Sequence, residues 1–421
     1  MGGFQDILIL VSFLIEVAVL LYLELKAWRS LYTPLIFLMV PYSIILLISI
    51  AISGNFGFVD FYYPSIFIWS VGLVLFAIPS YVLAFVLQKH NRPLNSSMAE
   101  EDMPKLIVYI AVFVILLFVW RFRSVNGAFP IGSRDFGDEL CGKGIWGHLR
   151  QLSLPILMMS IYFVDRQRWW LWLIIVPIFI IAVLYQILGW LIIPCLVGIM
   201  LRLYTGKTKL RLSLMLYVVL GVAVVFLGSY VISLVLVEEN DLDNEVLSFI
   251  FRNFIHYLTS GTLGLSVDME LGFPDEGEFD MVIAQLVNIA RALTGSGELI
   301  VPLNPYYYNT GFNLTNVRTF FGTVLINADY VTFALFVLFV SSAIYLMKVA
   351  TIRFNNIYVY TAYFFECGLL FMGWFDSYFA SLSVIEIPML SLALWLLCKL
   401  CKPKMNELKL QECTLSAIVN S

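Results

Sequence analysis

The stretch "TPLIFLMVPYSIILLISIAI", residues 33–52, contains no charged side chain. A helix of about 20 mostly apolar residues is long enough to cross the hydrocarbon core of a bilayer. Over the whole chain, 61% of residues are hydrophobic and only 13% are charged, whereas about a quarter of the residues in soluble domains are charged. The sequence therefore predicts an all-α polytopic integral membrane protein.

Similar apolar segments recur along the 421 residues and predict about 11 transmembrane helices in a single integral membrane domain, 1–421. The segments are 6–24, 33–52, 65–87, 106–121, 147–163, 168–184, 188–204, 212–237, 328–348, 356–374 and 386–401. The N-terminus lacks the pattern of a cleavable signal peptide, so we expect 6–24 to be the first span.

Basic residues are distributed unevenly between the two sets of loops. With the N-terminus outside, seventeen of the 25 Lys and Arg residues lie in the inner loops and the C-terminal tail. Because cytoplasmic loops are enriched in Lys and Arg, the N-terminus is expected outside and the C-terminus in the cytoplasm. Two outer segments then stand out, the first outer loop (122–146) and the large outer loop (238–327). Loops longer than about 15 residues are usually functional, so we expect the active residues there.

The large outer loop contains the segment "EVLSFIFRNFIHYLTSG", residues 245–261, which predicts a helix that ends near Gly261. Arg252 and His256 lie on one stripe of that helix because they are four residues apart. Two interpretations stay open. The helix lies on the membrane surface with a solvated polar stripe, or Arg252 and His256 lie over the mouth of a cavity.

The rest of the large loop has further candidate residues. "MVIAQLVNIARALTG", residues 281–295, predicts a second helix with Arg291 on its polar face. "VPLNPYYYNTGFN", residues 301–313, places Tyr306 and Tyr307 among asparagines. Aromatic rings with amide groups suit sugars, which stack on rings and form hydrogen bonds through their hydroxyls. An interfacial aromatic cluster is an equally good interpretation.

The first outer loop includes "NGAFPIGSRDFGDELCGKG", residues 126–144, with Arg134 among glycines and acids. The planar fork of arginine suits phosphate, but a surface Arg–Asp pair explains the same pattern. Cys398 and Cys401 form a CxxC at the end of the last apolar segment, but none of the three histidines lies near them, so we expect neither a metal nor a cofactor. A net charge of −4 likewise predicts no nucleic-acid partner.

The segment "NVRTFFGTVLINADYV", residues 316–331, begins with Asn316, Arg318 and Thr319 and later contains Asp329. One interpretation is that these groups face a ligand at the entrance to a span. The other is that Asn316 and Thr319 cap the helix while Arg318 extends to the lipid headgroups.

The architecture and two of these motifs resemble the Wzy-type O-antigen or oligosaccharide repeat-unit polymerases of bacteria. "GAFPIGSRDFG" is similar to the family's first outer loop with its arginine, here Arg134. "NVRTFFGTVLINADYV" is similar to the segment that follows the large loop, with Asn316, Thr319, Gly322 and Asp329 in matching places. The chain departs from the family after Asp329 and at "QILGW", where many members have a polar turn.

The resemblance implies glycosyl transfer from undecaprenyl-diphosphate-linked oligosaccharide, as donor, to a second such molecule at the outer leaflet of the bacterial inner membrane. It implies the lipid bilayer and a chain-length regulator as partners, with no metal. The catalytic residues would be Arg134 and Arg318 at the diphosphate, with His256 as base or Asp329, deeper in a cavity wall, as the alternative. The residues expected to bind substrate are Arg252, Arg291, Asn316, Thr319, Tyr306 and Tyr307.

Two other functions fit the same sequence. An O-antigen ligase would use similar outer arginines and a histidine to transfer finished glycan to lipid A core. A flippase or other transporter for lipid-linked oligosaccharide should place cations along a central path. Here the outer-side cations gather at one face, which favours an enzyme.

Overall fold

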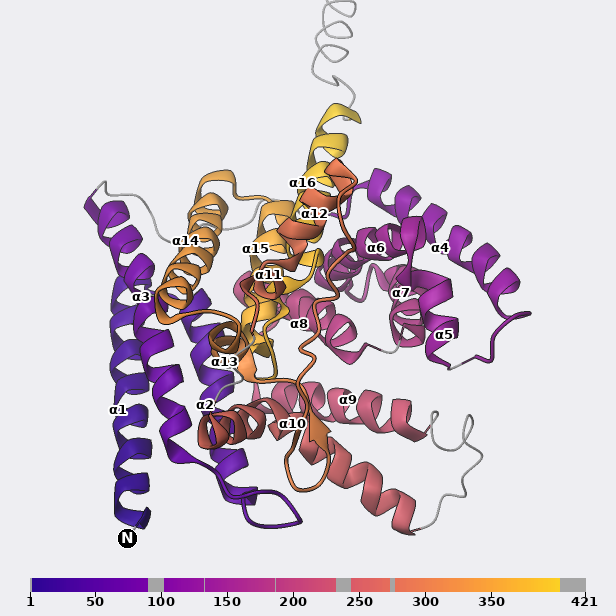
Figure 1. Cartoon of the computed structure of the whole chain (residues 1–421). Helices are drawn as coiled ribbons and strands as arrows, with labels where there is room; N and C mark the ends of the chain where they lie inside the picture. Colours follow the sequence, from indigo (N-terminus) through magenta and orange to yellow (C-terminus); the bar gives the residue numbers. More distant parts are fainter. Residues whose placement is uncertain are drawn as a thin grey trace, which may run out of the picture.

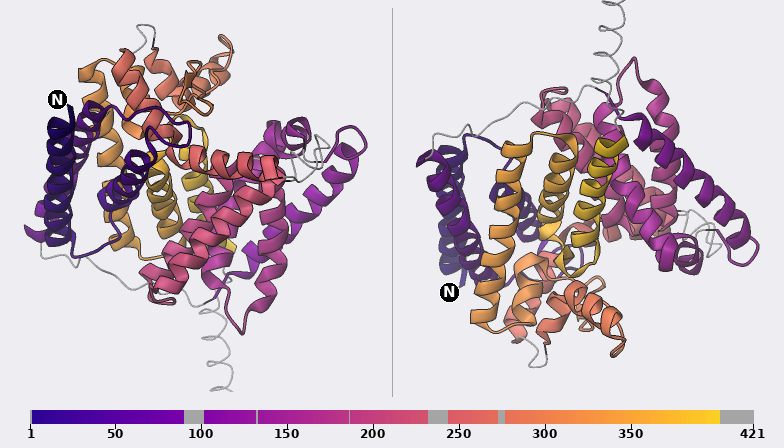
Figure 2. Two further views of the ribbon diagram at one scale, coloured as in Figure 1. Left: turned by 90° about the horizontal axis from the view of Figure 1, so that it is seen from below. Right: turned by 90° about the horizontal axis from the view of Figure 1, so that it is seen from above.

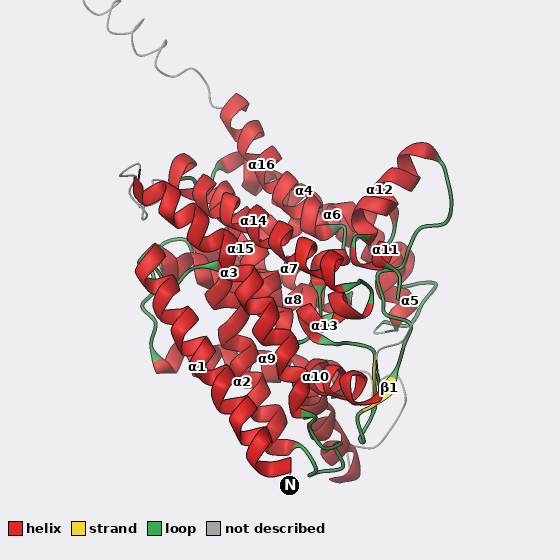
Figure 3. Cartoon of the chain, turned by 60° about the vertical axis from the view of Figure 1, so that its left-hand side comes forward, coloured by secondary structure: helices red, strands yellow, loops and turns green. Residues whose placement is uncertain are grey.

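The structure is a computed structural model that describes residues 2–89, 102–131, 133–185, 187–231, 244–272 and 277–401. Nearly all of the described elements are helices (Figure 3). Within this part of the chain, the only sheet is an antiparallel pair, β1 (Tyr308–Asn309) and β2 (Leu314–Thr315). The predicted all-α fold is confirmed.

Helices of the first half are α1 (Gly2–Trp28), α2 (Pro34–Ile52), α3 (Ile66–Lys89), α4 (Lys105–Val125), α5 (Arg134–Gly137), α6 (Gly144–Phe163), α7 (Trp172–Leu184) and α8 (Leu188–Tyr204). Those of the second half are α9 (Leu212–Val231), α10 (Asn244–Leu271), α11 (Phe279–Val282), α12 (Ala284–Thr294), α13 (Thr319–Ile326), α14 (Tyr330–Phe354), α15 (Ile357–Phe371) and α16 (Ser383–Cys401). Short helical turns are Tyr63–Ser65, Asp138–Gly142, Trp169–Leu171, Met372–Trp374 and Tyr378–Ala380.

Six of the described helices are long and apolar enough to cross a membrane, namely α1, α2, α3, α4, α14 and α16. Shorter apolar helices cover 169–184 and 189–204. All eleven predicted segments fall on helices, although 212–237 is described only as far as Val231. The chain is therefore a multi-pass membrane protein, while the count of eleven spans stays a prediction.

Internal prolines are a second sign that these helices belong in a membrane. Proline in the middle of a soluble helix removes a hydrogen bond and costs about 3 kcal/mol, whereas membrane helices tolerate it because neighbouring groups satisfy the freed carbonyl. The prolines inside helices are Pro41, Pro79, Pro155, Pro177, Pro194 and Pro388.

Large apolar side chains also point outward from the bundle. Ile15 on α1 is 60% exposed and Phe85 on α3 is 69% exposed. A contiguous apolar surface of this kind is unusual on a soluble monomer and marks a surface that contacts lipid or a partner. The outward side chains of α1 and α3 are therefore positioned to face lipid tails.

The helices form two connected groups (Figure 1). On the left of Figure 1, α3 packs against α1 and α14, and α15 packs against α2, α8 and α16 in the centre. On the right, α4, α5 and α7 enclose a separate apolar cluster around Phe118, Phe136 and Ile181. In both views of Figure 2 the N-terminus and α11–α13 lie toward the same edge, whereas in Figure 1 the N-terminus is at the bottom and α12 lies near α16.

The large outer loop differs from its predicted form in two places. The helix predicted to stop at Gly261 continues to Leu271, and every residue from Thr259 to Asp268 is buried. A helix segment that is buried on all sides lies inside the protein, so the second half of α10, beyond the predicted helix, is part of the bundle. Over 245–258, where Leu247 and Phe251 are 50% and 58% exposed, both interpretations of the predicted helix stay open. The segment 316–331 is likewise not one continuous entry into a span, because α13 is a separate short helix before α14.

Small residues explain why α10 can continue through this crowded region. A Cβ added at Gly261 would lie 2.2 Å from the carbonyl oxygen of Phe375. A Cβ at Gly264 would lie 2.4 Å from the carbonyl oxygen of Val317. Glycine therefore acts here as a packing residue that lets two backbones approach, and not as a helix terminator.

We predict that Gly261→Ala lowers the stability of the detergent-solubilised protein by about 1–3 kcal/mol, because the added methyl group overlaps backbone atoms. The matched control is Gly221→Ala on α9, where nothing lies within 4 Å of an added Cβ. There the higher helix propensity of alanine should leave stability unchanged or raise it by up to about 1 kcal/mol. Thermal unfolding measures both, and equal effects of the two substitutions would contradict this packing role.

Candidate functional site

A buried ion pair joins α10 to the start of α13. Nε of Arg318 donates a hydrogen bond to Oδ2 of Asp268 across 2.5 Å, and both side chains are 0% exposed. Taking two charges out of water costs several kcal/mol for each ion, and good geometry is needed to compensate. The pair therefore fixes the position of the guanidinium inside the protein, and the interpretation of Arg318 as a headgroup-seeking side chain is wrong.

The guanidinium of Arg318 retains unused hydrogen-bonding capacity. Its Nη1 and Nη2 groups have no hydrogen-bond partner, and neither does Oδ1 of Asp268. The ring of Tyr308 lies 4.7 Å from Cζ of Arg318, within the range of a cation–π contact. A buried guanidinium with two free N–H donor groups is well suited to bind the oxygens of a phosphate.

Thr319, next to Arg318, has a strained backbone. Its φ of +67° lies in the left-handed region, which is a genuine outlier for a β-branched residue. Two hydrogen bonds stabilise this backbone conformation. The amide of Thr319 donates to the carbonyl of Phe375 across 3.0 Å, and its Oγ1 accepts from Nε1 of Trp69 at 3.0 Å. Such strain concentrates at functional sites.

A second carboxyl group lies at the other side of α13. Oδ1 of Asp376 accepts a hydrogen bond from the hydroxyl of Thr323 at 2.5 Å and another from the amide of Ser377 at 2.8 Å. Burial raises the pKa of Asp376 to about 6, although these two bonds act in the opposite direction. Asp376 can therefore exchange a proton near neutral pH.

His256 lies on α10 and is 8% exposed. Its Nδ1 lies 3.2 Å from Oγ1 of Thr310, whose hydroxyl donates to the carbonyl of Asn313 at 2.8 Å. Burial lowers the pKa of His256 from its usual 6.5, with the Leu314 carbonyl opposing the shift. Burial therefore favours the neutral form of the imidazole.

The segment 308–310, which begins with β1, connects the histidine to the arginine. Tyr308 contacts Arg318, and Thr310, two residues further on, contacts His256. Residues i and i+2 of an extended strand point to the same face and lie about 7 Å apart. The structure thus brings two of the predicted catalytic residues, Arg318 and His256, against one short segment of the large outer loop.

The other predicted residues around this segment have mixed roles. Nη2 of Arg252 donates to the carbonyl of Phe56 at 2.8 Å, and its guanidinium stacks on Phe312. Nδ2 of Asn316 donates to the Asn304 carbonyl at 3.1 Å. The Arg252 contact ties the large outer loop to the segment that follows α2, whereas the Asn316 contact lies within the loop itself.

Of the neighbouring tyrosines, Tyr306 is half-buried. Tyr307 is 60% exposed. The tyrosine that faces the arginine is Tyr308, the third ring of the same run, and no pattern in the sequence relates it to Arg318. The exposed ring of Tyr307 remains available to stack on a sugar.

Arg291 lies on α12, and its guanidinium contacts residues of the same large outer loop. Its Nη1 donates to the carbonyl of Glu298 at 2.5 Å, and Nη2 lies 4.0 Å from Asp280. On the same helix, Asn288 exchanges two hydrogen bonds with the backbone of Ile300. These contacts explain how α12 is attached to the loop that follows it, and they do not bring Arg291 to Asp268 or Tyr308.

Asp329 is not deep in a cavity wall as expected. Its side chain is exposed and caps the N-terminus of α14, with Oδ1 accepting from the amides of Val331 and Thr332 and Oδ2 accepting from the Thr332 hydroxyl. These bonds lower the pKa of Asp329. An aspartate before a helix is a preferred N-cap, and that local role explains its position.

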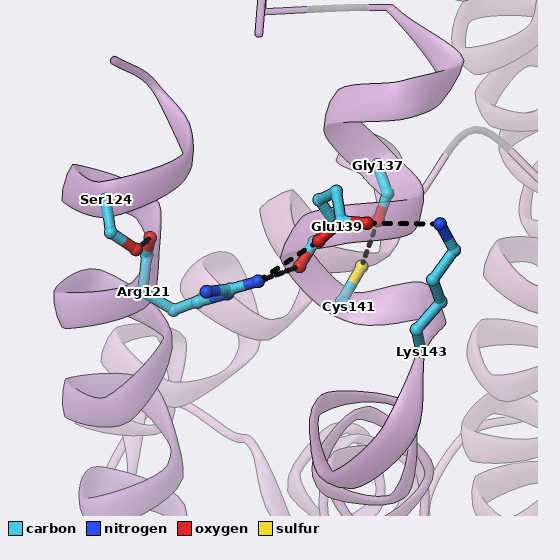
Figure 4. Close-up of polar contacts among 6 residues, drawn as sticks. All are labelled: Arg121, Ser124, Gly137, Glu139, Cys141 and Lys143. Carbon is cyan, nitrogen blue, oxygen red and sulfur yellow. Dashed lines mark hydrogen bonds and ion pairs between the residues drawn. The ribbon is translucent and has the colours of Figure 1, made fainter. Parts of the chain in front are cut away.

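Arg134 begins α5, on the opposite side of Figure 1 from α13. Its side chain lies outside the described part of the structure. Nearby, Arg121 forms an ion pair with Glu139 at 3.4 Å, and Lys143 lies 3.1 Å from the same carboxylate (Figure 4). The fold therefore does not place the backbone at Arg134 beside Arg318, as a single diphosphate site with both arginines would require.

Sequence reasoning missed the acidic partners of the site. The sequence analysis ends the helix at Gly261 and therefore does not place Asp268 on it. A single aspartate in the mostly apolar run "GTLGLSVDMEL" could have indicated a buried acidic residue. Asp376 lies in a turn far along the chain, and no local pattern relates it to α13. Among the residues that the structure covers, no group of three or more His, Cys, Asp or Glu side chains could hold a metal ion.

Breaking the buried pair should be costly. We predict that Arg318→Met and Asp268→Leu each destabilise the protein by about 3–5 kcal/mol, because each leaves an unpaired buried charge. The double substitution removes both charges and should cost far less than the sum of the two. A double-mutant cycle of unfolding measures this difference, and additive costs would show that the two residues do not interact.

The stability should also depend on pH through His256. Its pKa is lower in the folded than in the unfolded protein, so the unfolded state binds more protons and stability falls as the pH drops below 6.5. His256→Gln should therefore lose less stability than the wild type between about pH 7.5 and 5.5. Thermal unfolding at a series of pH values measures this, and parallel curves for the two proteins would disprove the buried neutral state.

The geometry of this site can be compared with what is known of related proteins. A family of unknown function, DUF6337, matches residues 57–404. No curated protein and no solved structure matches the chain. Because the matched region covers most of the 421 residues, the chain belongs to this family of unknown function.

Proposed function

We propose that the protein is a Wzy-type polymerase that joins undecaprenyl-diphosphate-linked oligosaccharide repeat units into O-antigen, capsular or a related surface polysaccharide. The observation that carries the proposal is the buried Arg318, whose two Nη groups have no protein partner. The sequence resemblance of the segments around Arg134 and Arg318 to this family supports it. In this proposal the reaction takes place at the outer leaflet of the bacterial inner membrane.

The reaction is a glycosyl transfer. A hydroxyl oxygen of the acceptor forms a bond to the anomeric carbon of the donor glycan, and the bond from that carbon to the diphosphate oxygen breaks. The electron pair leaves with undecaprenyl diphosphate, and the hydroxyl proton passes to a base. Charge therefore develops on the diphosphate, and one preorganised donor at that charge is worth about 3 kcal/mol. The energy is already present in the lipid-linked donor, so the proposal includes no cofactor.

Arg318 suits this role because its orientation is fixed before substrate binds. Asp268 holds Nε at 2.5 Å, so the two remaining donor groups keep one direction in the site. Asp268 is in this proposal a positioning residue for the arginine. The guanidinium fork can then donate two parallel hydrogen bonds to the diphosphate, which a lysine cannot do.

His256 is the proposed base. The Thr310 hydroxyl donates to Asn313, so its oxygen is free to accept from Nδ1 of His256. Nε2 is then the nitrogen that takes the proton, and a neutral imidazole is the form required. Asp329 is less suitable because its oxygens accept three hydrogen bonds from its own helix.

Other parts of the proposal concern the surroundings. Tyr306, Tyr307 and Asn316 are proposed to contact the glycan, and a chain-length regulator is the proposed protein partner. The N-terminus is proposed to lie outside and the C-terminus in the cytoplasm. The excess of Lys and Arg in the inner loops and the C-terminal tail supports this orientation.

The test is a glycan gel of cells in which the gene is deleted and then restored. Deletion should collapse the polysaccharide ladder to a single repeat unit, and the wild-type gene should restore it. Arg318→Gln should fail to restore it, because loss of about 3 kcal/mol lowers the rate roughly a hundredfold. Arg318→Lys should restore only short chains. All variants are compared at matched membrane abundance.

The matched control is Arg123→Gln, an exposed arginine near the end of α4, which should restore the full ladder. Loss of even the single repeat unit from the lipid anchor would instead indicate a ligase or a flippase. An intact ladder in the deletion strain would contradict the proposal altogether.

A further inference from the structure

A second buried arginine lies on α6, in the right-hand group of helices in Figure 1 and away from α13. Arg150 is 6% exposed, and its Cζ lies 3.6 Å from the ring centroid of Tyr185, just after α7. Its Nε and Nη1 are buried and have no hydrogen-bond partner. The side chain is therefore fixed against an aromatic ring with two N–H groups unused.

Arg150 also lacks a counter-ion. Within the described part of the chain, no carboxylate oxygen lies within 4.0 Å of its guanidinium nitrogens. Asp138 and Arg150 both act on Cys141, in opposite directions, but they do not form an ion pair with each other. By contrast, Arg121 and Arg318 each have a carboxylate partner. A cation buried without a partner is costly, and in a membrane protein it usually marks a binding site or a pathway.

The position of Arg150 indicates which kind of anion could act as its counter-ion. It lies six residues into α6, which corresponds to about 9 Å along the axis from the start of the helix. For a helix that starts at the bilayer surface, this distance corresponds to the polar layer that holds the lipid phosphates, since that layer adds about 5–8 Å to each side of the hydrocarbon core. A guanidinium binds phosphate oxygens through paired N–H groups, and stacking on tyrosine orients it.

We propose that Arg150 and Tyr185 form a binding site for the phosphate group of an anionic membrane lipid, between α6 and the end of α7. The site is separate from Arg318 and does not depend on the proposed glycosyl transfer. The bound phosphate supplies the missing counter-ion of Arg150 and thereby fastens the right-hand helix group to the surrounding lipid.

The test is native mass spectrometry of the full-length protein, purified in detergent and titrated with phosphatidylglycerol against a phosphatidylcholine background. The wild type should retain one phosphatidylglycerol molecule more tightly than any other bound lipid. Arg150→Gln should weaken that binding at least tenfold, and Tyr185→Leu should weaken it less because the charge remains. The matched control is Arg121→Gln, which removes an arginine that already has a carboxylate partner and should leave lipid binding unchanged.

A parallel titration with inorganic phosphate distinguishes the two sources of the same chemistry. The proposal predicts that millimolar phosphate neither displaces the lipid nor raises the unfolding temperature of the lipid-free protein. Displacement would show a site for soluble phosphate and overturn the assignment to lipid. Equal lipid retention by the wild type, Arg150→Gln and Tyr185→Leu would overturn the site itself. If Arg150→Gln does not fold, the Tyr185→Leu titration decides between these outcomes.

Discussion

A guanidinium and a carboxylate that are both excluded from water must stay together, and this constraint organises the large outer loop. Asp268 stands near the end of α10 and Arg318 immediately before α13, so their ion pair joins two elements that are fifty residues apart. The glycines of α10 allow the backbones around Val317 and Phe375 to come close enough for that contact. The strained φ of Thr319 is a further consequence of the tight fit.

Much of the fold follows from the sequence by simple physics. Apolar runs of sufficient length can only be buried or placed in lipid, so all eleven predicted segments fall on helices. What could not be predicted depends on contacts between distant segments. From the sequence alone, Gly261 indicates the end of a helix. In the structure it permits close packing of two backbones, and this role depends on the segment around Phe375, which is distant in the sequence. Asp329 was assigned to a cavity, whereas the common local role of an N-cap explains it.

The candidate site was predictable to a similar extent. Arg318 and His256 were selected from their residue types and do meet at one segment. Their partners Asp268, Tyr308 and Asp376 were not, because hydrogen-bond partners across a membrane bundle leave no periodic pattern. Arg134 illustrates the opposite case, since its motif is similar to a catalytic loop while its helix lies on the other side of the bundle.

Two buried arginines, Arg318 and Arg150, each have N–H groups without a hydrogen-bond partner. Arg318 is paired and retains two free donor groups, which suits a group that must bind a transient charge and then release it. Arg150 has no carboxylate partner among the residues that the structure describes, which suits an anion that remains bound. The two proposals thus assign a transient ligand to the arginine that has a carboxylate partner and a lasting ligand to the arginine that has none.

The most direct test of the central claim is reconstitution of the purified protein in liposomes with undecaprenyl-diphosphate-linked repeat units and no nucleotide. We predict that lipid-linked glycans of two or more units form, and that one undecaprenyl diphosphate is released for each bond made. Liposomes with Arg318→Gln protein should form neither product. Movement of the lipid-linked unit across the bilayer without any elongation would contradict the account and identify a transporter.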